Sequence, residues 1–391
     1  MKKVAKSFYL HGRQTFLHAA SRILQQGGLR PPPPPSPIRN ILFIRTDRIG
    51  DLVLTTPAFA AIKTAFPNSM LTVLASRGNV GLLNHHPWVD QFFVYDSAVS
   101  ISAKINMIKS LRTRRFDIII DPLTGHDLAP AVLACLIGAP IRIGFSGFGR
   151  EVFFNRTAAA AGSDRHMVDA ISDLIHLIGV ADGGRDPQLF LGTEEMEWAG
   201  RWADRVNPER KRLVGIHPGA YYETQRWGAA NFAGLIQRLS LESDCRVVLL
   251  GGLAEEGLVR RISEQVGEIP PVFISSNLRQ ALAMISRLDF LVCNNSGPLH
   301  MAAALSVPTL SFMGPTEISR WMPLGEKHRV LRAVELECIG CNRGICPKGT
   351  LECRNRISPE MMFHALKDHM ESMMRPPAPI PLFVPISKRI P

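Results

Sequence analysis

Short apolar runs alternate with longer stretches of helical periodicity along most of the chain. In the first half, the short runs are typical of buried strands, and the stretches between them repeat apolar positions at the spacing of an amphipathic helix. The expected strands of this half cover residues 41–45, 71–75, 92–95 and 117–120. The expected helices cover residues 52–66, 102–114 and 127–137.

The same alternation returns in the second half, after a region in which it is weak. Across residues 141–195 we expect only one element, a helix at 166–178. The expected strands of the second half cover residues 213–217, 247–250, 272–275, 290–293 and 309–312. The expected helices cover residues 231–241, 255–266, 278–287 and 298–305.

This alternation predicts βαβ units and therefore an α/β fold with parallel sheets. The simplest arrangement is two doubly wound, Rossmann-like halves, at residues 39–190 and 191–372, with the division near 185–211. In such sheets the ligand lies beyond the carboxyl ends of the strands. We therefore expect a ligand cleft between the halves, and the polar residues that follow each strand carry the functional information.

Both ends of the chain are expected to lie outside this fold. Residues 1–38 combine six Lys or Arg in the first 30 positions, with no Asp or Glu, and a run of five prolines at 31–35. Consecutive prolines cannot continue a helix and favour an extended spacer. Residues 373–391 are again rich in proline and show no periodicity.

Composition and charge narrow the class of protein. The 391 residues are 46% hydrophobic and 20% charged, which is typical of a globular protein, and no apolar stretch is long enough for a spanning helix. The net charge is +11, and the basic first segment suggests an anionic surface, either membrane lipid or nucleic acid, unless it is only a solvated tail. Aromatic residues make up only 7%, which argues against a stacking surface for nucleic acid.

The first candidate for chemistry follows the first expected strand, where residues 45–51 read RTDRIGD. Gly50 permits a tight turn, and Asp51 lies at or near the start of the next helix. Asp51 either caps that helix or places a carboxylate in the cleft as a general base. Neither GxGxxG nor GxxxxGK[ST] is present, so dinucleotide and P-loop chemistry are not supported.

Three strand ends of the second half carry candidate ligand contacts. After strand 213–217, Gly219 allows backbone amides to approach a phosphate, and Arg226 stands a few residues further on. After strand 247–250, the acids at 255–256 could accept hydrogen bonds from a ribose or act only as helix-dipole partners. After strand 290–293, residues 294–300 read NNSGPLH, and the amides of the helix that starts there suit a diphosphate.

Taken together, these motifs resemble the ADP-heptose:lipopolysaccharide heptosyltransferase family, glycosyltransferase family 9. The resemblance rests on DRIGDLVLTTP at 47–57, HPG at 217–219, RW at 226–227, NSGPLHMAAA at 295–304 and FMGPT at 312–316, and it covers about residues 39–372. It implies a GT-B architecture with the acceptor on the domain at 39–190 and the nucleotide-sugar on the domain at 191–372. It also implies an inverting glycosyl transfer that needs no metal, from ADP-heptose to a lipopolysaccharide core or another anionic glycan.

The resemblance also implies roles for individual residues. Asp51 matches the general base that deprotonates the acceptor hydroxyl. The donor-binding positions carried over are Gly219, Ala220, Gln225, Arg226, Glu256, Asn295, Ser296, Gly297 and His300. Two of them depart from the family pattern, because Gln225 stands where Lys is common and Asn295 where Asp is usual. The expected location is cytoplasmic, peripheral on the inner membrane surface, with no nucleic-acid partner.

Four of the seven cysteines are grouped within sixteen residues: Cys338, Cys341, Cys346 and Cys353. Four thiolates can hold zinc or iron tetrahedrally, and the Cys-x2-Cys spacing suits half of such a site. Comparable cysteine clusters occur in some relatives. The alternative is a reduced loop without metal.

Two other functions remain open at this stage. An epimerase of nucleotide-sugars could use the same two-domain plan, but it would not need the Gly50-Asp51 motif. A catalytically silent, membrane-bound relative is the other, and Gln225 and Asn295 are the residues that keep it open. A family member with a different donor sugar would also account for these two departures.

Overall fold

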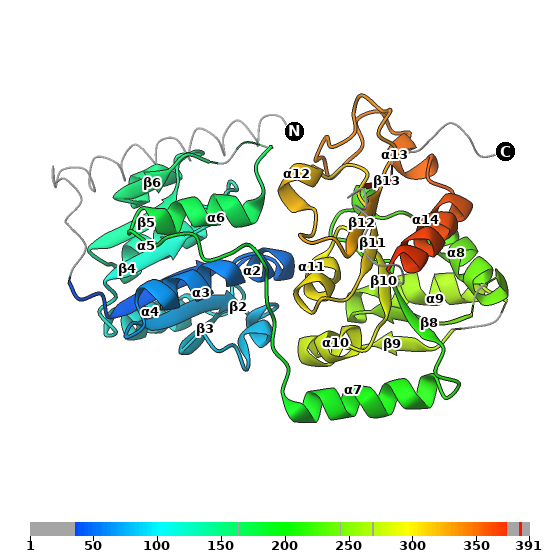
Figure 1. Cartoon of the computed structure of the whole chain (residues 1–391). Helices are drawn as coiled ribbons and strands as arrows, with labels where there is room; N and C mark the ends of the chain where they lie inside the picture. Colours follow the sequence, from blue (N-terminus) through cyan, green and yellow to red (C-terminus); the bar gives the residue numbers. More distant parts are fainter. Residues whose placement is uncertain are drawn as a thin grey trace. The chain divides into compact units, whose positions relative to one another are not determined.

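The computed structural model describes residues 36–160, 162, 164–242, 244–267 and 270–373, and the backbone of 383–384. The chain divides between Arg185 and Asp186 into two compact units, which we call unit 1 and unit 2. Each unit is built on one parallel sheet with helices (Figure 1). The basic segment expected before residue 36 and most of the expected tail after 373 lie outside the described residues.

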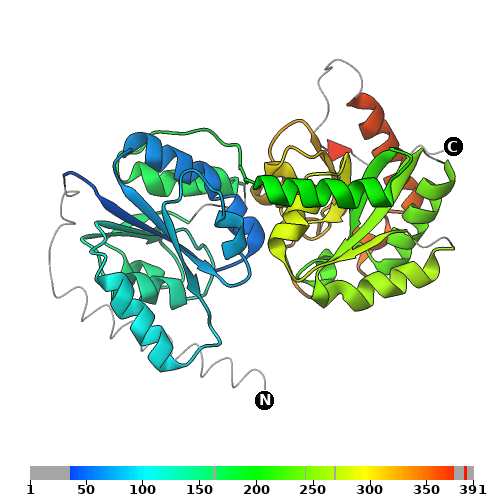
Figure 2. The same ribbon diagram turned by 90° about the horizontal axis from the view of Figure 1, so that it is seen from below.

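Unit 1 contains a six-stranded sheet in the order β3-β2-β1-β4-β5-β6, with every pair parallel. Its strands are β1 (Asn40–Arg45), β2 (Met70–Ser76), β3 (Gln91–Tyr95), β4 (Ile118–Asp121), β5 (Ile141–Phe145) and β6 (Arg156–Ala158). Its helices are α2 (Ile49–Val53), α3 (Thr56–Ala65), α4 (Ile101–Arg112), α5 (Ala129–Ile137) and α6 (Met167–His176). Helices α3 and α6 lie on one face of the sheet, and α4 and α5 on the other (Figure 2).

Helices on both faces explain why the central strand, β1, is apolar at its four interior positions. Ile41, Leu42, Phe43 and Ile44 are all buried, as expected for a parallel strand covered on both sides. Leu42 and Ile44 join one apolar cluster with Leu111 of α4 and residues of α5. The strand can therefore present polar groups only where it ends, at Arg45.

One expected helix is wrong in this unit. The segment predicted as a single helix at 52–66 forms two, α2 and α3, separated at Leu54–Thr55. Pro57 has no N–H to donate, and its ring would clash with the carbonyl of residue 53 in a continuous helix. The hydroxyls of Thr55 and Thr56 instead donate to the backbone oxygens of Asp51 and Val53. As a result, Asp51 stands on a helix of five residues.

Unit 2 contains a seven-stranded parallel sheet in the order β13-β12-β11-β10-β7-β8-β9. Its strands are β7 (Arg212–His217), β8 (Cys245–Gly251), β9 (Val272–Ile274), β10 (Phe290–Asn294), β11 (Thr309–Phe312), β12 (His328–Leu331) and β13 (Phe383–Val384). Its helices are α7 (Thr193–Val206), α8 (Ala229–Glu242), α9 (Glu256–Gln265), α10 (Leu278–Ile285), α11 (Gly297–Ala304), α12 (Ile318–Trp321), α13 (Glu352–Asn355) and α14 (Pro359–Ser372). Helix α8 packs between α9 and α14, and α10 packs against α7 and α11.

The fold class expected from the sequence is confirmed, although several elements were not predicted. The weak region at 141–195 contains β5, β6 and the start of α7 in addition to the expected helix. Strand β6 has only three residues, too few to show a period. Among the described helices, none has the length and apolar character required to cross a bilayer.

Candidate active site

The strand order of unit 1 reverses between β1 and β4, and a crevice at the carboxyl ends is expected at such a point. A small cavity of about 30 Å³ lies there, and its polar lining includes Arg45, Asp47, Asp121 and Asp127. Arg45 ends β1, and Asp121 ends β4. The sheet topology therefore brings together charged groups that are far apart in the sequence.

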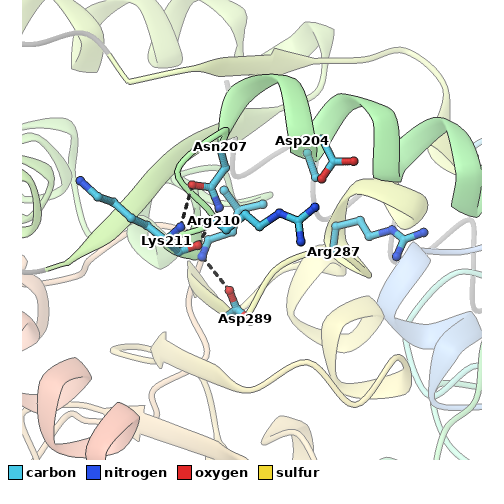
Figure 3. Close-up of a pocket in the computed structure, with 8 residues that line it drawn as sticks. Asp204, Asn207, Arg210, Lys211, Arg287 and Asp289 are labelled. Atoms are coloured by element: carbon cyan, nitrogen blue, oxygen red, sulfur yellow. Dashed lines mark hydrogen bonds between the residues drawn. The ribbon is translucent and has the colours of Figure 1, made fainter.

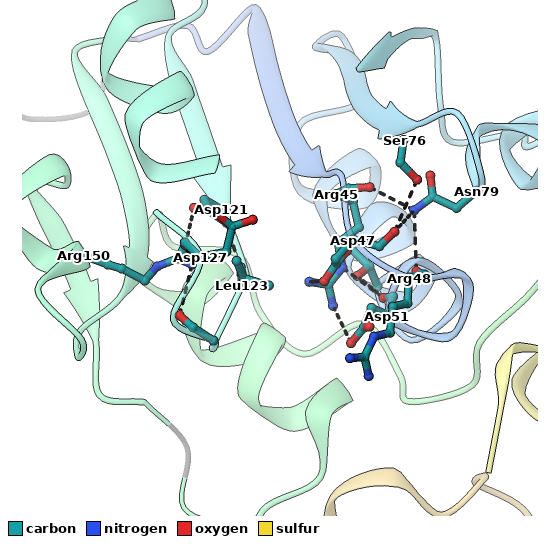
Figure 4. Close-up of polar contacts among 12 residues, drawn as sticks. Arg45, Asp47, Arg48, Asp51, Ser76, Asn79, Asp121, Leu123, Asp127 and Arg150 are labelled. Atoms are coloured by element: carbon teal, nitrogen blue, oxygen red, sulfur yellow. Dashed lines mark hydrogen bonds and ion pairs between the residues drawn. The ribbon is translucent and has the colours of Figure 1, made fainter. Parts of the chain in front are cut away.

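Asp51 lies close to this crevice, on α2. Its side chain is 15% exposed, and its Oδ1 is 3.7 Å from Nη2 of Arg45. The Nε of Arg45 also donates to the backbone oxygen of Asp51 at 3.0 Å (Figure 4). The N-cap position of α2 is occupied by Arg48, so Asp51 is not the capping residue of this helix.

Two further carboxylates at this edge have unusual acidity. Burial raises the pKa of Asp47 to about 7, although the charge of Arg45 opposes this effect. Burial likewise raises the pKa of Asp121 to about 6 against the opposing charge of Arg150. Asp121 and Arg150 form a fully buried ion pair, and Arg150 also donates to the backbone oxygen of Asp127 at 2.7 Å (Figure 4).

In unit 2 the strand order reverses between β10 and β7, and Asn294 organises the backbone at that point. The buried Nδ2 of Asn294 donates to the backbone oxygens of Pro218 at 2.8 Å and Gly219 at 3.2 Å. Its Oδ1 accepts a hydrogen bond from the backbone N–H of Trp227 at 3.0 Å. One amide therefore holds the turn after β7 against the end of β10.

The turn at Gly219 allows no side chain. A Cβ at this position would lie 2.8 Å from Cγ of Glu255 and 2.8 Å from Cε1 of His217. Burial lowers the pKa of His217, and the nearby Glu255 opposes that shift. Next to this turn, the backbone oxygen of Ala220 accepts a hydrogen bond from Nε of Arg226 at 3.0 Å.

Of the two acids Glu255 and Glu256, Glu255 is the one whose side chain lies against the Gly219 turn. Its carboxylate accepts a hydrogen bond from the backbone N–H of Gly252 at 3.0 Å. Glu256 begins α9 and is exposed. The donor-binding role expected for Glu256 stays a prediction, and nothing in the sequence distinguishes Glu255 from Glu256 for this role.

The predicted residues Ser296, Gly297 and His300 lie at the start of α11, directly after β10. The side chain of Ser296 does not cap this helix, because its hydroxyl donates to the backbone oxygen of Asn294 instead. His300 lies one turn in and is 4% exposed. The start of α11 is thus next to the Gly219 turn that Asn294 holds.

The two positions that depart from the family pattern lie together. Nε2 of Gln225 and Nδ2 of Asn295 both donate to Oγ1 of Thr316, at 3.4 Å and 3.2 Å. Thr316 is buried and follows the turn after β11. A neutral pair that shares a hydroxyl therefore stands where the resemblance implies a cation and an anion.

The cysteine segment packs against the same part of unit 2. The backbone N–H of Gly340 donates to the oxygen of Gly314, and Oγ1 of Thr224 donates to the oxygen of Arg343. Burial raises the pKa of Cys353, and the other three thiols of the group raise it further, so the four sulfurs lie near one another. Within the described residues, no three His, Cys, Asp or Glu side chains are arranged to hold a metal ion.

A larger cavity, of about 300 Å³, lies elsewhere in unit 2 (Figure 3). It is lined by charged side chains near the amino ends of β7 and β10, among them Arg210, Lys211, Arg287 and Asp289. None of the predicted site residues lines it. Its position, at the opposite edge of the sheet from Asn294, separates it from the candidate site.

Each of the two units is a Rossmann-like α/β domain with polar groups at the switch point of its sheet. Solved structures share this fold. The family 9 glycosyltransferase from Veillonella parvula aligns over 85% of this chain and 98% of its own, with 23% identity and a TM-score of 0.76. ADP-heptose lps heptosyltransferase II from E. coli aligns over 86% and 100%, with 22% identity and a TM-score of 0.68.

Sequence comparison identifies the family. The model of glycosyltransferase family 9 (heptosyltransferase) matches residues 105–351, and the chain belongs to this family. It is 25% identical to lipooligosaccharide heptosyltransferase 2 of Haemophilus influenzae over 346 residues, 84% of this chain and 99% of that protein. It is 26% identical to lipopolysaccharide heptosyltransferase 2 of Salmonella typhimurium over 75% of this chain and 88% of that protein. The protein is therefore a transferase.

Within each unit, the structure gathers most of the predicted site residues at one edge of the sheet. It adds residues that the sequence did not single out as site residues: Arg45, Asp47, Asp121, Arg150, Asn294 and Thr316. Asp47 and Asn294 stood within recognised motifs, so their places directly after strands could have marked them. Arg150 lies in the region where the periodicity is weak, and nothing local marks it.

Proposed function

We propose that this protein is an inverting glycosyltransferase that moves a heptose from ADP-heptose to a lipopolysaccharide core or a related anionic glycan. The membership in family 9 supports it, and so do relatives named as lipopolysaccharide heptosyltransferases. The observation that carries the proposal is that each unit has a polar site at the switch point of its sheet. In unit 1 the carboxylate of Asp51 lies beside the guanidinium of Arg45, and in unit 2 Asn294 holds the Gly219 turn beside the start of α11.

In the proposed reaction, unit 1 holds the acceptor and Asp51 acts as its general base. The carboxylate of Asp51 takes the proton of the acceptor hydroxyl, and the hydroxyl oxygen forms a bond to the anomeric carbon of the donor. The bond from that carbon to the diphosphate oxygen breaks, and ADP leaves with the electron pair. Attack from the side opposite the leaving group inverts the anomeric centre.

Unit 2 is proposed to hold the donor and stabilise the leaving diphosphate. The Gly219 turn permits close approach of a phosphate, and the amino end of α11 presents the positive end of its dipole. Arg226 adds a cation beside that turn. Preorganised contacts of this kind are worth about 3 kcal/mol each in the transition state. Glu255, or Glu256 as expected from the sequence, would accept hydrogen bonds from the nucleoside.

Peripheral contact with an anionic membrane is part of the proposal, and α4 offers a surface for it. Residues 101–115 contain five Lys or Arg and no Asp or Glu. Ile101 and Ile105 are exposed one turn apart on this helix, and Ile101 is 76% exposed. Basic side chains with exposed aliphatic groups suit a lipid surface that carries negative charge.

We propose that the four-cysteine segment binds zinc or iron in a structural role, separate from the chemistry, although the described residues do not arrange three of these thiols as a ligand set. The pKa of Cys346 is lowered by backbone N–H groups, first that of Leu351, which favours the thiolate form that a metal needs. TibC from enterotoxigenic E. coli, a solved structure with a TM-score of 0.54 to this chain, is described as iron-containing. Elemental analysis of the purified chain should find about one metal atom, and its absence would refute this role.

The function is tested by ADP release from a panel of nucleotide-sugars, with heptose-free lipopolysaccharide as the acceptor. We expect release with ADP-heptose that depends on the acceptor. Release with another nucleotide-sugar alone would indicate a different donor, and no release from any of them would indicate a catalytically silent relative.

A further inference from the structure

The guanidinium of Arg45 joins two carboxylates of unit 1. Its Nη1 is 3.0 Å from Oδ2 of Asp47, and its Nη2 is 3.7 Å from Oδ1 of Asp51. Its Nε donates to the backbone oxygen of Asp51 at 3.0 Å. Arg45 itself is 1% exposed, so water screens these contacts poorly (Figure 4).

The backbone around Asp47 is fixed by side chains from the neighbouring strand and loop. Nδ2 of Asn79 donates to the backbone oxygens of Arg45 at 3.0 Å and Asp47 at 3.3 Å. Oγ of Ser76 donates to the backbone oxygen of Asp47 at 3.2 Å (Figure 4). Asp47 therefore holds its place against Arg45, and its second oxygen, Oδ1, is buried with no hydrogen-bond partner among the described residues.

The charges that act on Asp47 come from three elements. Arg45 of β1 favours its ionised form, while Asp51 of α2 and Asp121 of β4 oppose it. Asp121 is itself paired with Arg150, which reduces its influence. Together with burial, this arrangement raises the pKa of Asp47 to about 7. Both forms of Asp47 are therefore present near neutral pH.

We propose that Asp47 is a positioning residue for Asp51, and that its negative charge, acting through Arg45, makes Asp51 a stronger base. This inference rests on the proposed function, in which Asp51 takes the acceptor proton. In this role Asp47 acts on Asp51 through Arg45 and is assigned no bond to the substrate.

The direction of the effect follows from the geometry. When Asp47 is ionised, it takes up part of the positive charge of Arg45 and adds a negative charge near Asp51, and both effects favour proton uptake by Asp51. When Asp47 is protonated, the charge of Arg45 acts on Asp51 alone and opposes that uptake. Turnover should therefore rise with pH as Asp47 loses its proton.

The test compares the pH dependence of kcat for the full-length chain and its Asp47→Asn variant, with ADP-heptose and heptose-free lipopolysaccharide. The wild type should show an acidic limb with a midpoint near pH 7. In Asp47→Asn this limb should disappear, and kcat above pH 8 should fall about tenfold, the size of one such charge effect. Asp47→Glu, which keeps the charge, should restore the limb.

Two further measurements separate a positioning role from a general structural one. The KM for the acceptor and the Kd for ADP should stay within about twofold of wild type in Asp47→Asn, since the proposed role of Asp47 changes the base and not the binding of either substrate. Asp173→Asn removes a partly exposed carboxylate of unit 1 that pairs with Arg165, and it should keep the wild-type profile. If Asp47→Asn does not fold, Asp47→Ser is measured and interpreted in the same way.

The outcomes distinguish this inference from the function on which it rests. An unchanged acidic limb in Asp47→Asn, or a loss of activity as complete as in Asp51→Asn, overturns the positioning role of Asp47. Full activity in Asp51→Asn instead overturns the role of Asp51 as the base.

Discussion

Gln225 and Asn295 share one hydrogen-bond acceptor, the buried hydroxyl of Thr316. The resemblance implies Lys at position 225 and Asp at position 295, so both departures replace a charged side chain with a neutral carboxamide. Because the two side chains meet at one atom, the departures are matched: the site loses a cation and an anion together. The loss of two charges therefore does not leave one of them buried and unpaired.

Charge restored at only one of these positions should change nucleotide affinity. Asn295→Asp adds a negative charge near the proposed diphosphate position and should weaken ADP binding about tenfold, whereas Gln225→Lys should strengthen it. Because the single effects have opposite signs, the double variant is compared with their sum, and we expect it to depart from that sum because the new charges pair with each other. Isothermal calorimetry with ADP measures all three. Strictly additive effects would show that the two side chains do not act on each other.

Removal of the proposed base should act on turnover alone. Asp51→Ala is expected to lower kcat by about 10²–10⁴ and to leave the Kd for ADP unchanged, because the donor is assigned to unit 2. The measurement is ADP release together with calorimetry, and Asp173→Asn serves as the control. A variant that keeps most of its turnover would contradict the assignment.

The raised pKa of Asp47 also predicts a dependence of stability on pH. A carboxyl with a pKa of about 7 in the folded state, and its usual value near 4 when unfolded, binds more protons folded than unfolded between those values. Its contribution to the free energy of unfolding therefore decreases as pH rises from 4 to 7. Asp47→Asn has no such proton to lose, so its stability relative to wild type should improve by ~2 kcal/mol from pH 5 to pH 8.

Urea unfolding of the wild type and Asp47→Asn at several pH values tests this difference, with unit 1 followed separately from unit 2. The difference between the two proteins removes the contribution of Asp121, whose raised pKa also lowers the free energy of unfolding as pH rises. It also removes that of the buried His328 and His369, whose lowered pKa values destabilise unit 2 as pH falls. A difference that stays constant with pH would contradict the prediction.

The membrane surface proposed on α4 predicts binding to anionic vesicles. Lys104→Gln combined with Lys109→Gln should weaken binding to phosphatidylglycerol vesicles about thirtyfold, since each basic residue near such a surface contributes ~1 kcal/mol. Ile101→Ser combined with Ile105→Ser should weaken it as well. Leu241→Ser changes an 85% exposed side chain of unit 2 and is the matched control. Equal binding of all variants would show that the contact lies elsewhere.

The fold class could be predicted from the sequence because strands that are buried on both faces appear as nearly continuous apolar runs. Positions 41–45 and 290–293 are almost continuously apolar, and each run is followed directly by polar residues that are candidates for the site. The limits of α2 and α3 were missed because the helical period continues through Pro57, although the hydrogen bonds cannot. Strand β6 was missed because three residues cannot display a pattern.

The electrostatics of the site could not be obtained from the sequence. Asp47 and Asp51 are visible in one motif, but the effect of Arg45 on both depends on which way each side chain turns. The ion pair of Asp121 and Arg150 joins residues 29 positions apart, and only the sheet order brings them together. The meeting of Gln225 and Asn295 at Thr316 is another such contact.

The interruption at Leu54–Thr55 has a consequence for redesign of the enzyme. Because α2 and α3 are separate helices, a shift of α3 on repacking against α6 need not move Asp51, which lies on α2. The single turn that carries Asp51 is held instead by the Arg45 side chain and the Thr55 hydroxyl. Substitutions in α3 that are made for thermostability should therefore leave the position of the Asp51 carboxylate unchanged.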